Sequence, residues 1–194
     1  KRIFSLINKT RIYEIVTYNK KLQNKFEITL KDYQNLSGKY KIGGQNGNVK
    51  IYKLNTNLLL YEGEYKNGKK NGKGKEYYNN GEIIFEGIFK RGKKIGIGKE
   101  YLNCNKKLYL IFEGEYKNGN KNGKGKEFDK NGEVQFEGEY KNGKRNGKGI
   151  IYYYNGRIKY EGEFLNGVKH GKGCEYNWFG DIVKETLWTK NNYN

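Results

Sequence analysis

The chain has 194 residues, of which 39 are Lys or Arg and 21 are Asp or Glu, and its formal net charge is +18. Because only 35% of the residues are hydrophobic and 19 residues are Tyr, we expect a thin core of aromatic rings and glycine and exclude a deep aliphatic core. No apolar run reaches the roughly 18 residues that a membrane-spanning helix needs, so we expect no such helix. The excess of basic residues favours partners that carry phosphate, as nucleic acid and lipid do.

Residues 1–35 differ in pattern from the rest of the chain. Their apolar residues recur at steps of three and four, as Ile12 and Val16 do, and this spacing predicts helix. Thr10 and Thr29 are suitable N-terminal caps for two of the helices. We therefore expect a short α-helical N-terminal cap at residues 1–35 that covers the open edge of the region after it.

From residue 36 onward one phrase repeats. Its copies begin near residues 36, 61, 85, 112, 136 and 160, and half a copy begins near residue 184. Repetition at a fixed period of this size indicates an array in which each unit contacts only its neighbours. The sequence therefore predicts two regions, the helical cap at 1–35 and one repeat array at 36–194.

Each good copy has the pattern of a β-hairpin. In the copy near 136, Phe136, Gly138 and Tyr140 alternate with Glu137 and Glu139, and such alternation is typical of a strand. A second strand follows the K-N-G-K-x-N-G phrase. We predict that Asn-Gly pairs at 80–81, 131–132 and 155–156 then reverse the chain, in turns whose two central residues both have positive φ.

Glycine alternates with aromatic residues in these strands. A glycine inside a strand weakens the strand and has no side chain to pack. Its recurrence therefore indicates that another group lies flat against it. We infer that an aromatic ring from a neighbouring strand or copy covers each such glycine. The third copy is longer by three residues and has Asn103 to Lys107 in place of an Asn-Gly turn, which predicts a loop insertion on one face.

The sequence offers no candidate for catalysis or metal binding. His170 is the only histidine and occupies a turn-forming position where other copies have Asn. Cys104 and Cys174 occupy unrelated positions, which favours free thiols in a reducing compartment. Glu pairs such as Glu62 and Glu64 recur in every copy and indicate a solvated strand face. We therefore expect no enzyme activity, no cofactor and no metal.

The phrase Y-E-G-E-Y-K-N-G-K-K-N-G-K-G at residues 61–74 resembles the MORN (membrane occupation and recognition nexus) repeat. The resemblance is strong over residues 61–183 and weak outside them. It implies a mainly β fold, in which stacked antiparallel hairpins form one elongated sheet. The residues that carry the repeat pattern are Tyr61, Gly63, Tyr65, Gly72, Gly74, Phe85, Gly87, Phe112, Gly114, Phe136, Gly138, Tyr160 and Gly162.

The resemblance also implies a role as a scaffold or adaptor, and some members of the family bind phosphoinositides or form homodimers. Basic residues of the loops form a candidate anion-binding ladder: Lys69, Lys70, Lys93, Lys94, Lys121, Lys144 and Arg145. Our first hypothesis is a non-catalytic scaffold that binds a protein partner. The alternative is peripheral binding to an anionic phospholipid membrane, and nucleic acid is a weaker candidate because the aromatic residues are needed for packing.

Two further expectations concern the first part of the chain. Residues 3–23 are similar to the latter part of an F-box, which offers a role in ubiquitin ligation as a lesser alternative. The chain starts without Met and has no secretory leader, so we expect a fragment or a processed form. The expected location is the cytoplasm, with peripheral attachment to membrane or cytoskeleton as a variant of it.

Overall fold

The computed structural model describes residues 38–54 and 56–188, which form one antiparallel sheet of 13 strands. The predicted helical cap at 1–35 lies outside the described residues. The strands are β1 (Lys39–Ile42), β2 (Gly47–Lys53), β3 (Leu59–Lys66), β4 (Lys69–Tyr77), β5 (Ile83–Lys90), β6 (Lys93–Cys104), β7 (Lys107–Lys117), β8 (Asn120–Phe128), β9 (Val134–Lys141), β10 (Lys144–Tyr152), β11 (Ile158–Leu165), β12 (Val168–Tyr176) and β13 (Ile182–Trp188).

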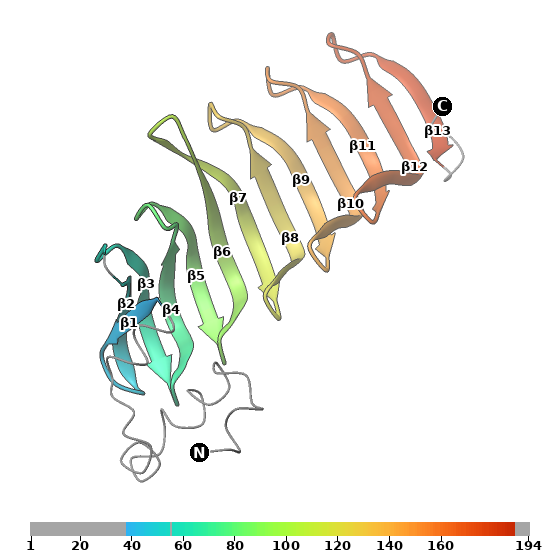
Figure 1. Cartoon of the computed structure of the whole chain (residues 1–194). Helices are drawn as coiled ribbons and strands as arrows, with labels where there is room; N and C mark the ends of the chain where they lie inside the picture. Colours follow the sequence, from blue (N-terminus) through green and yellow to red (C-terminus); the bar gives the residue numbers. More distant parts are fainter. Residues whose placement is uncertain (1–37, 55, 189–194) are drawn as a thin grey trace, which may run out of the picture.

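The strands follow one another across the sheet in the order of the sequence. Figure 1 shows the result, an elongated and twisted single layer whose described part has no second layer over either face. The described residues form no helix, so none of them supplies a long apolar helix that could cross a membrane. The elongated single sheet of stacked hairpins that the sequence predicts is therefore confirmed.

A row of glycines crosses the middle of the sheet. Cross-strand pairs join Gly63 to Gly74, Gly74 to Gly87, and so on through ten consecutive strands as far as Gly173. The row ends where Val49 pairs with Gly63 at one end and Thr186 pairs with Gly173 at the other. Each strand thus leaves its backbone bare at the same level.

Aromatic rings cover this row on one face of the sheet, the ring face. A Cβ built on Gly138 would come within 2.6 Å of the Phe136 ring and 2.6 Å of the Gly149 Cα. A Cβ on Gly149 would lie 2.6 Å from the same ring and 3.1 Å from Phe164. Each glycine is therefore covered by a ring as the sequence predicts, but the ring belongs to the glycine's own strand as often as to a neighbouring one.

The rings also form a continuous zigzag. Phe112 makes edge-to-face contacts with Tyr116 of its own copy and with Tyr140 of the next, at centroid distances of 5.8 and 5.2 Å. The same pair of contacts recurs from Tyr61 to Trp188, and the rings from Phe85 to Phe164 are at most 5% exposed. Such pairs are worth about 0.5–1.5 kcal/mol each beyond the area they bury, so this zigzag is the core of the array.

The short turns and the long turns of the sheet are of different kinds. Within each copy from Tyr61 onward a two-residue turn joins the strands, and at Asn142 and Gly143 both central residues have positive φ, 51° and 85°. Between copies the turns at 80–81, 131–132 and 155–156 have positive φ only at the glycine. The predicted turn type is therefore wrong for these Asn-Gly pairs. Their longer loops match a type I turn followed by a glycine bulge, because the Gly81 amide donates to the Tyr78 carbonyl.

A bulge in each second strand links one copy to the next. The register of β3 and β4 shifts between the pair Gly63–Gly74 and the pair Tyr65–Lys70, and Gly72 within the bulge has a φ of 100°. The next turn reaches back to this point, since the Gly92 amide donates to the Lys70 carbonyl at 2.8 Å. Equivalent bonds recur in the following copies, so successive turns stack on one another.

The three extra residues of the third copy lengthen its strands instead of forming a loop. β6 and β7 continue to a two-residue turn at Asn105 and Lys106, both with positive φ. Figure 1 shows that this hairpin projects beyond its neighbours. Leu102 and Leu108, on its two strands, are 39% and 44% exposed.

Candidate functional site

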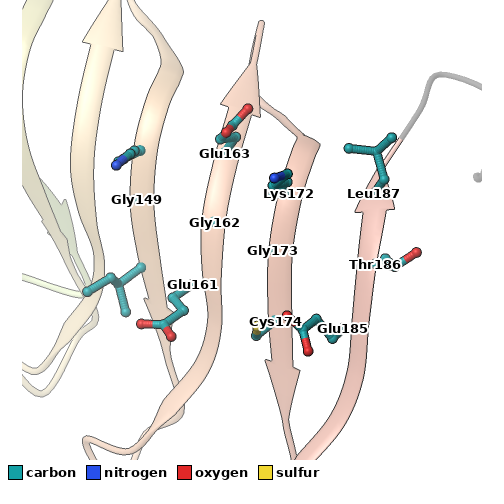
Figure 2. Close-up of a pocket in the computed structure, with 12 residues that line it drawn as sticks. Gly149, Glu161, Gly162, Glu163, Lys172, Gly173, Cys174, Glu185, Thr186 and Leu187 are labelled. Atoms are coloured by element: carbon teal, nitrogen blue, oxygen red, sulfur yellow. The ribbon is translucent and has the colours of Figure 1, made fainter.

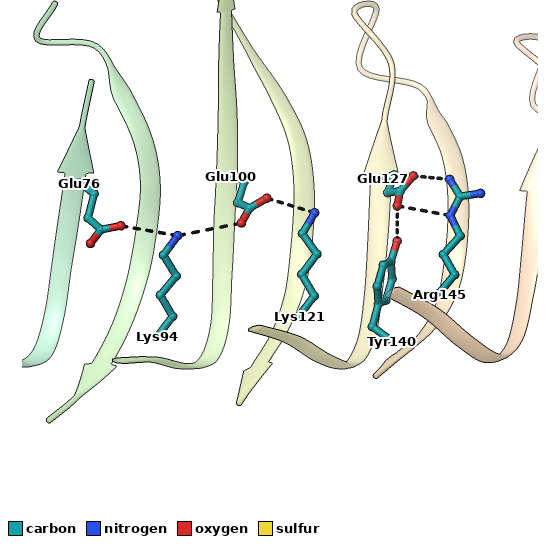
Figure 3. A network of polar contacts seen from close by, with 7 residues as sticks. All are labelled: Glu76, Lys94, Glu100, Lys121, Glu127, Tyr140 and Arg145. Carbon is teal, nitrogen blue, oxygen red and sulfur yellow. Dashed lines mark hydrogen bonds and ion pairs between the residues drawn. The ribbon is translucent and has the colours of Figure 1, made fainter. Parts of the chain in front are cut away.

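The ring face is closed by a ladder of ion pairs between basic and acidic residues. Lys94 lies over the Phe85 ring at 3.8 Å and pairs with Glu76 at 3.5 Å and Glu100 at 4.0 Å. Lys121 lies over Phe112 and pairs with Glu100 at 3.0 Å. Figure 3 shows how the ladder crosses the copies. The ring face therefore offers no apolar surface there, because charged side chains cover the rings.

Arg145 occupies the same position in the copy near 136. Its guanidinium lies 4.1 Å from the Phe136 ring centroid and binds the Glu127 carboxylate, to which Tyr140 also donates at 2.6 Å. Burial on its own would raise the pKa of Glu127, but the bonds from Arg145 and Tyr140 outweigh burial and lower it. Ile151 stands where the other copies have this Glu, so the ladder is interrupted between Arg145 and Lys169.

The structure divides the seven basic residues predicted to bind anions into two groups. Lys70, Lys94, Lys121 and Arg145 lie over rings and are paired with Glu, with side chains only 22–27% exposed. The other three lie exposed beside the short turns, with no carboxylate of the described residues within 4.0 Å: Lys69, Lys93 and Lys144. The sequence pattern could not separate the groups, because both kinds of lysine occur next to each other in the same phrase.

The exposed basic residues belong to a larger group at the short-turn edge of the sheet. We call this group the basic edge. It consists of Lys66, Lys69, Lys90, Arg91, Lys93, Lys117, Lys141 and Lys144, all of them exposed. The copy near 160 has Leu165 and Val168 at the matching positions, so the basic edge ends before the last copy.

The opposite face, the polar face, carries a row of alternating charges, which we call the Lys/Glu row. Cross-strand pairs place Glu and Lys opposite each other from Lys50 to Glu137. Ion pairs within the row measure 3.5 Å for Lys99–Glu113 and 3.1 Å for Lys126–Glu137. The row is therefore neutralised along most of its length, and these Glu residues do lie on a solvated face.

Some carboxylates of the polar face also have a structural task. Glu64 accepts a bond from the Lys73 amide at 3.1 Å, and Glu115 accepts one from the Lys124 amide at 3.1 Å. In both cases the amide belongs to the residue after the bulge glycine. The positive φ of that glycine turns the amide away from the backbone hydrogen bonds between the strands. Sequence reasoning missed this role, although a Glu stands eight residues before both of these bulge glycines, Gly72 and Gly123.

The alternation of Lys and Glu in the Lys/Glu row stops at its C-terminal end. Ile150 and Cys174 stand at the positions where the preceding copies have Lys, so Glu161 pairs across the strands with Ile150 on one side and Cys174 on the other. Glu185 pairs with Cys174. Among the described residues Glu161 and Glu185 have no cation within 4.0 Å.

A shallow groove follows this altered end of the row, and we call it the C-terminal groove. Its floor is the bare backbone of the glycine row on β10–β12 with Thr186 at the β13 end, and Glu161, Cys174 and Glu185 form one wall. Figure 2 shows the glycines between two levels of side chains, with these three residues on one level and Lys172 and Leu187 on the other. Burial raises the pKa of the Cys174 thiol, and the charges of both carboxylates raise it further.

Tyrosines border the row on its far side. The Tyr176 hydroxyl donates to Glu161 at 2.5 Å, and this bond raises the pKa of Tyr176 to about 12, with a further contribution from burial. Tyr77 donates to Glu62 in the same manner, and burial followed by this bond raises its pKa above its ordinary range. These tyrosines hold the carboxylates of the row in place.

The described residues provide neither a metal centre nor a disulfide. Within residues 38–54 and 56–188 no group of three His, Cys, Asp or Glu side chains is placed to hold a metal ion. Cys104 and Cys174 are both free thiols, and His170 takes the bulge position that Asn71 has in the copy near 61.

Two solved structures are distantly similar to this chain. A structure described as the crystal structure of TarM has a TM-score of 0.33 and 13% identity, covering 81% of this chain and 27% of that one. A mutant of S. aureus TarM in complex with fondaparinux, α-GlcNAc-glycerol and UDP has a TM-score of 0.21 and 10% identity, covering 91% of this chain and 27% of that one. The chain thus spans about a quarter of the length of these proteins.

Comparison with curated proteins finds no match. The sequence model of the MORN repeat matches this chain five times, at residues 61–83, 85–103, 112–134, 136–156 and 160–177. These five matches cover more than half of the chain and coincide with the hairpins from β3 to β12. The chain therefore belongs to the MORN repeat family.

Proposed function

We propose that this chain is a non-catalytic scaffold that binds a protein partner on the polar face of its sheet. MORN repeats are associated with binding to proteins or to membrane lipid, and the two faces of this sheet are unequal. On the ring face the rings pack on the glycine row and the ion-pair ladder covers them. The polar face carries side chains in regular rows and no described element covers it, which is the observation that carries the proposal.

The charge pattern of the polar face favours a protein over a lipid surface. A membrane with anionic lipids attracts clusters of basic residues, at about 1 kcal/mol for each residue near the surface. The Lys/Glu row instead alternates in sign, with pairs such as Lys99–Glu113 at 3.5 Å. A surface of alternating charge discriminates between partners by the placement of their charges.

Charge reversal on the polar face tests the proposal. We expect the Glu113→Lys/Glu137→Lys chain to lose the protein that the wild-type chain captures in a pull-down. The new positive charges stand opposite Lys99 and Lys126, so the alternation of charge that the partner would recognise is lost. The comparison variant reverses three residues of the basic edge, Lys69→Glu, Lys93→Glu and Lys144→Glu, which lie beside the short turns and outside the Lys/Glu row, and it should retain the partner. Loss of the partner from the comparison variant alone would contradict the proposal.

Binding to an anionic membrane is the second candidate, and the basic edge supports it. Eight exposed basic residues line one edge of the sheet at successive short turns, where a flat lipid surface could meet several of them at once. Flotation of the full chain with vesicles of phosphatidylcholine, with and without phosphoinositide, tests this candidate. Phosphoinositide-dependent flotation that the triple Lys→Glu variant abolishes would favour it, and no flotation at low salt would exclude it.

The ubiquitin-ligase alternative has a different basis. It rests on the F-box similarity of residues 3–23, which lie outside the described residues. Nothing in the described part of the chain supports it.

A further inference from the structure

We propose that the C-terminal groove binds an amphipathic helix of a partner protein, with a basic residue at each end of one helical heptad. This inference rests on the proposed scaffold function and names the segment that the scaffold recognises. Its starting point is the break in the Lys/Glu row, where Ile150 and Cys174 replace the lysines of earlier copies.

The break leaves two carboxylates that need a cation from elsewhere. Glu161 and Glu185 have no basic side chain within 4.0 Å among the described residues, whereas Glu113 and Glu137 each have one. Glu185 is exposed, and Glu161 is oriented by the bond from Tyr176. One wall of the groove therefore presents two negative charges, Glu161 held by a hydrogen bond and Glu185 exposed, while Lys148 and Lys172 also line the groove.

The spacing of the two carboxylates matches a helix. They lie on β11 and β13, two strands apart, which corresponds to about 10 Å along the row. Residues i and i+7 of a helix lie about 10.5 Å apart on one side of it. Residues on one side of an extended strand lie about 7 or about 13 Å apart, so a strand crossing the groove would match only one carboxylate at a time.

Apolar side chains lie beside the two charges along the same row. Cys174 is midway between Glu161 and Glu185, and Ile150 is one strand beyond Glu161. A helix with Lys or Arg at i and i+7 places residues i+3 and i+4 over Cys174, and residue i−4 over Ile150. Aliphatic side chains at these positions would cover both, so the groove selects a helix that is apolar between its basic residues.

A lysine on β13 disfavours pairing of a partner strand with the open edge of this strand. Lys184 stands at the position of the first ring of a copy and lies 4.8 Å from the Trp188 ring centroid. A lysine on an edge strand that covers the last ring is a common defence against strand addition. The partner therefore meets the face of the sheet here and not its edge.

The probe for this proposal is a labelled helical peptide of defined sequence. It carries Lys at i and i+7 and Leu at i−4, i+3 and i+4 on a background of Ala and Gln, and its binding to the full chain is measured by fluorescence anisotropy. The first control peptide has Glu in place of both Lys residues. The second has the same sequence except for a central Pro, which prevents helix formation.

Variants of the chain locate the binding. We expect Glu161→Gln/Glu185→Gln to weaken the binding of the peptide about tenfold, because both ion pairs are lost while the shape is kept. The matched variant Glu62→Gln/Glu86→Gln removes two carboxylates of the same row that already have lysine partners, and it should bind as the wild type does. Ile150→Lys/Cys174→Lys restores the alternation of earlier copies and should abolish binding.

Any of three results would overturn the proposal. They are equal binding of the Glu or the Pro peptide, an unchanged affinity in Glu161→Gln/Glu185→Gln, or equal weakening in Glu62→Gln/Glu86→Gln. A pull-down of the protein partner distinguishes failure of the groove proposal from failure of the scaffold proposal. A partner that is captured equally by wild type and by Glu161→Gln/Glu185→Gln would leave the scaffold standing and remove the groove from it.

Discussion

At the scale of single residues, the glycines of the glycine row leave no space for a side chain. Gly138 contacts backbone on one side and the Phe136 ring on the other, so a methyl group has no direction in which to escape. We expect Gly138→Ala to lower the free energy of unfolding by about 2–3 kcal/mol, as overpacking of a tight core does. Urea denaturation followed by circular dichroism measures this change.

Gly44 provides the matched control for that substitution. It lies in the loop after β1, has no positive φ, and a Cβ there would meet its nearest atom at 3.5 Å. Gly44→Ala should therefore shift the free energy of unfolding by less than about 0.5 kcal/mol. If Gly138→Ala were as mild as Gly44→Ala, the packing of rings on glycines would not be the basis of the fold.

Tyr176 gives a second test at this scale. Its bond to Glu161, together with burial, raises its pKa to about 12, whereas an unfolded Tyr ionises near 10. Since the folded state keeps the proton longer, Tyr176 stabilises the fold fully below pH 10, and this contribution is lost as the pH rises through 12. Ultraviolet titration of the wild type and of Tyr176→Phe isolates its transition, and Glu161→Gln should move that transition toward 10.

At the scale of the hairpin, the projecting β6–β7 unit has an unusual turn. Lys106 has a φ of 64° in a position where the other short turns have glycine. A left-handed conformation costs a residue with a Cβ about 1–2 kcal/mol, and the entropy lost by glycine offsets part of that. Lys106→Gly should therefore stabilise this hairpin by about 0.5–1 kcal/mol, seen as slower amide hydrogen exchange at Leu102 and Tyr109. Unchanged exchange would indicate that the turn relaxes in solution.

The turns also show what a sequence can predict at this scale. Alternation of apolar and polar residues depends only on the pleat of a strand, so it predicted the strands around Phe136 and Gly138 directly. An Asn-Gly pair fits both a two-residue turn and a longer loop with a glycine bulge, and the pair alone does not say which. The wrong assignment at 80–81, 131–132 and 155–156 has this origin.

Side-chain direction limited the prediction of the site in a similar way. Lys69 and Lys70 are neighbours in one strand, so they point to opposite faces, and only Lys70 meets a ring and a carboxylate. The phase of that alternation depends on the turn before it. The C-terminal groove was not predicted either, because it depends on which strands put Ile150 and Cys174 beside Glu161.

At the scale of the whole molecule, the array behaves as a stack of equivalent units. Each strand pairs only with its neighbours in the sheet, ring contacts such as Phe112–Tyr140 join adjacent copies, and the glycine row and the ring zigzag continue with the same register from copy to copy. The stability of such a molecule is approximately a sum of unit and interface terms. A copy can therefore be removed without creating a new kind of contact, provided that the register of the row is kept.

Deletion of residues 112–135 tests this property, because it joins Ile111 to Phe136 and places Gly138 opposite Gly98, where Gly114 was. We expect a folded chain with an unchanged β-sheet circular dichroism spectrum, a lower free energy of unfolding, and a maximum dimension in X-ray scattering shorter by about 10 Å, the width of two strands. Deletion of residues 112–123 joins the first part of β7 to the last part of β8, so that the sheet has one strand fewer; it reverses the direction of every later strand and should unfold the chain. If both deletions folded equally well, pairing along the glycine row would not determine the order of the sheet.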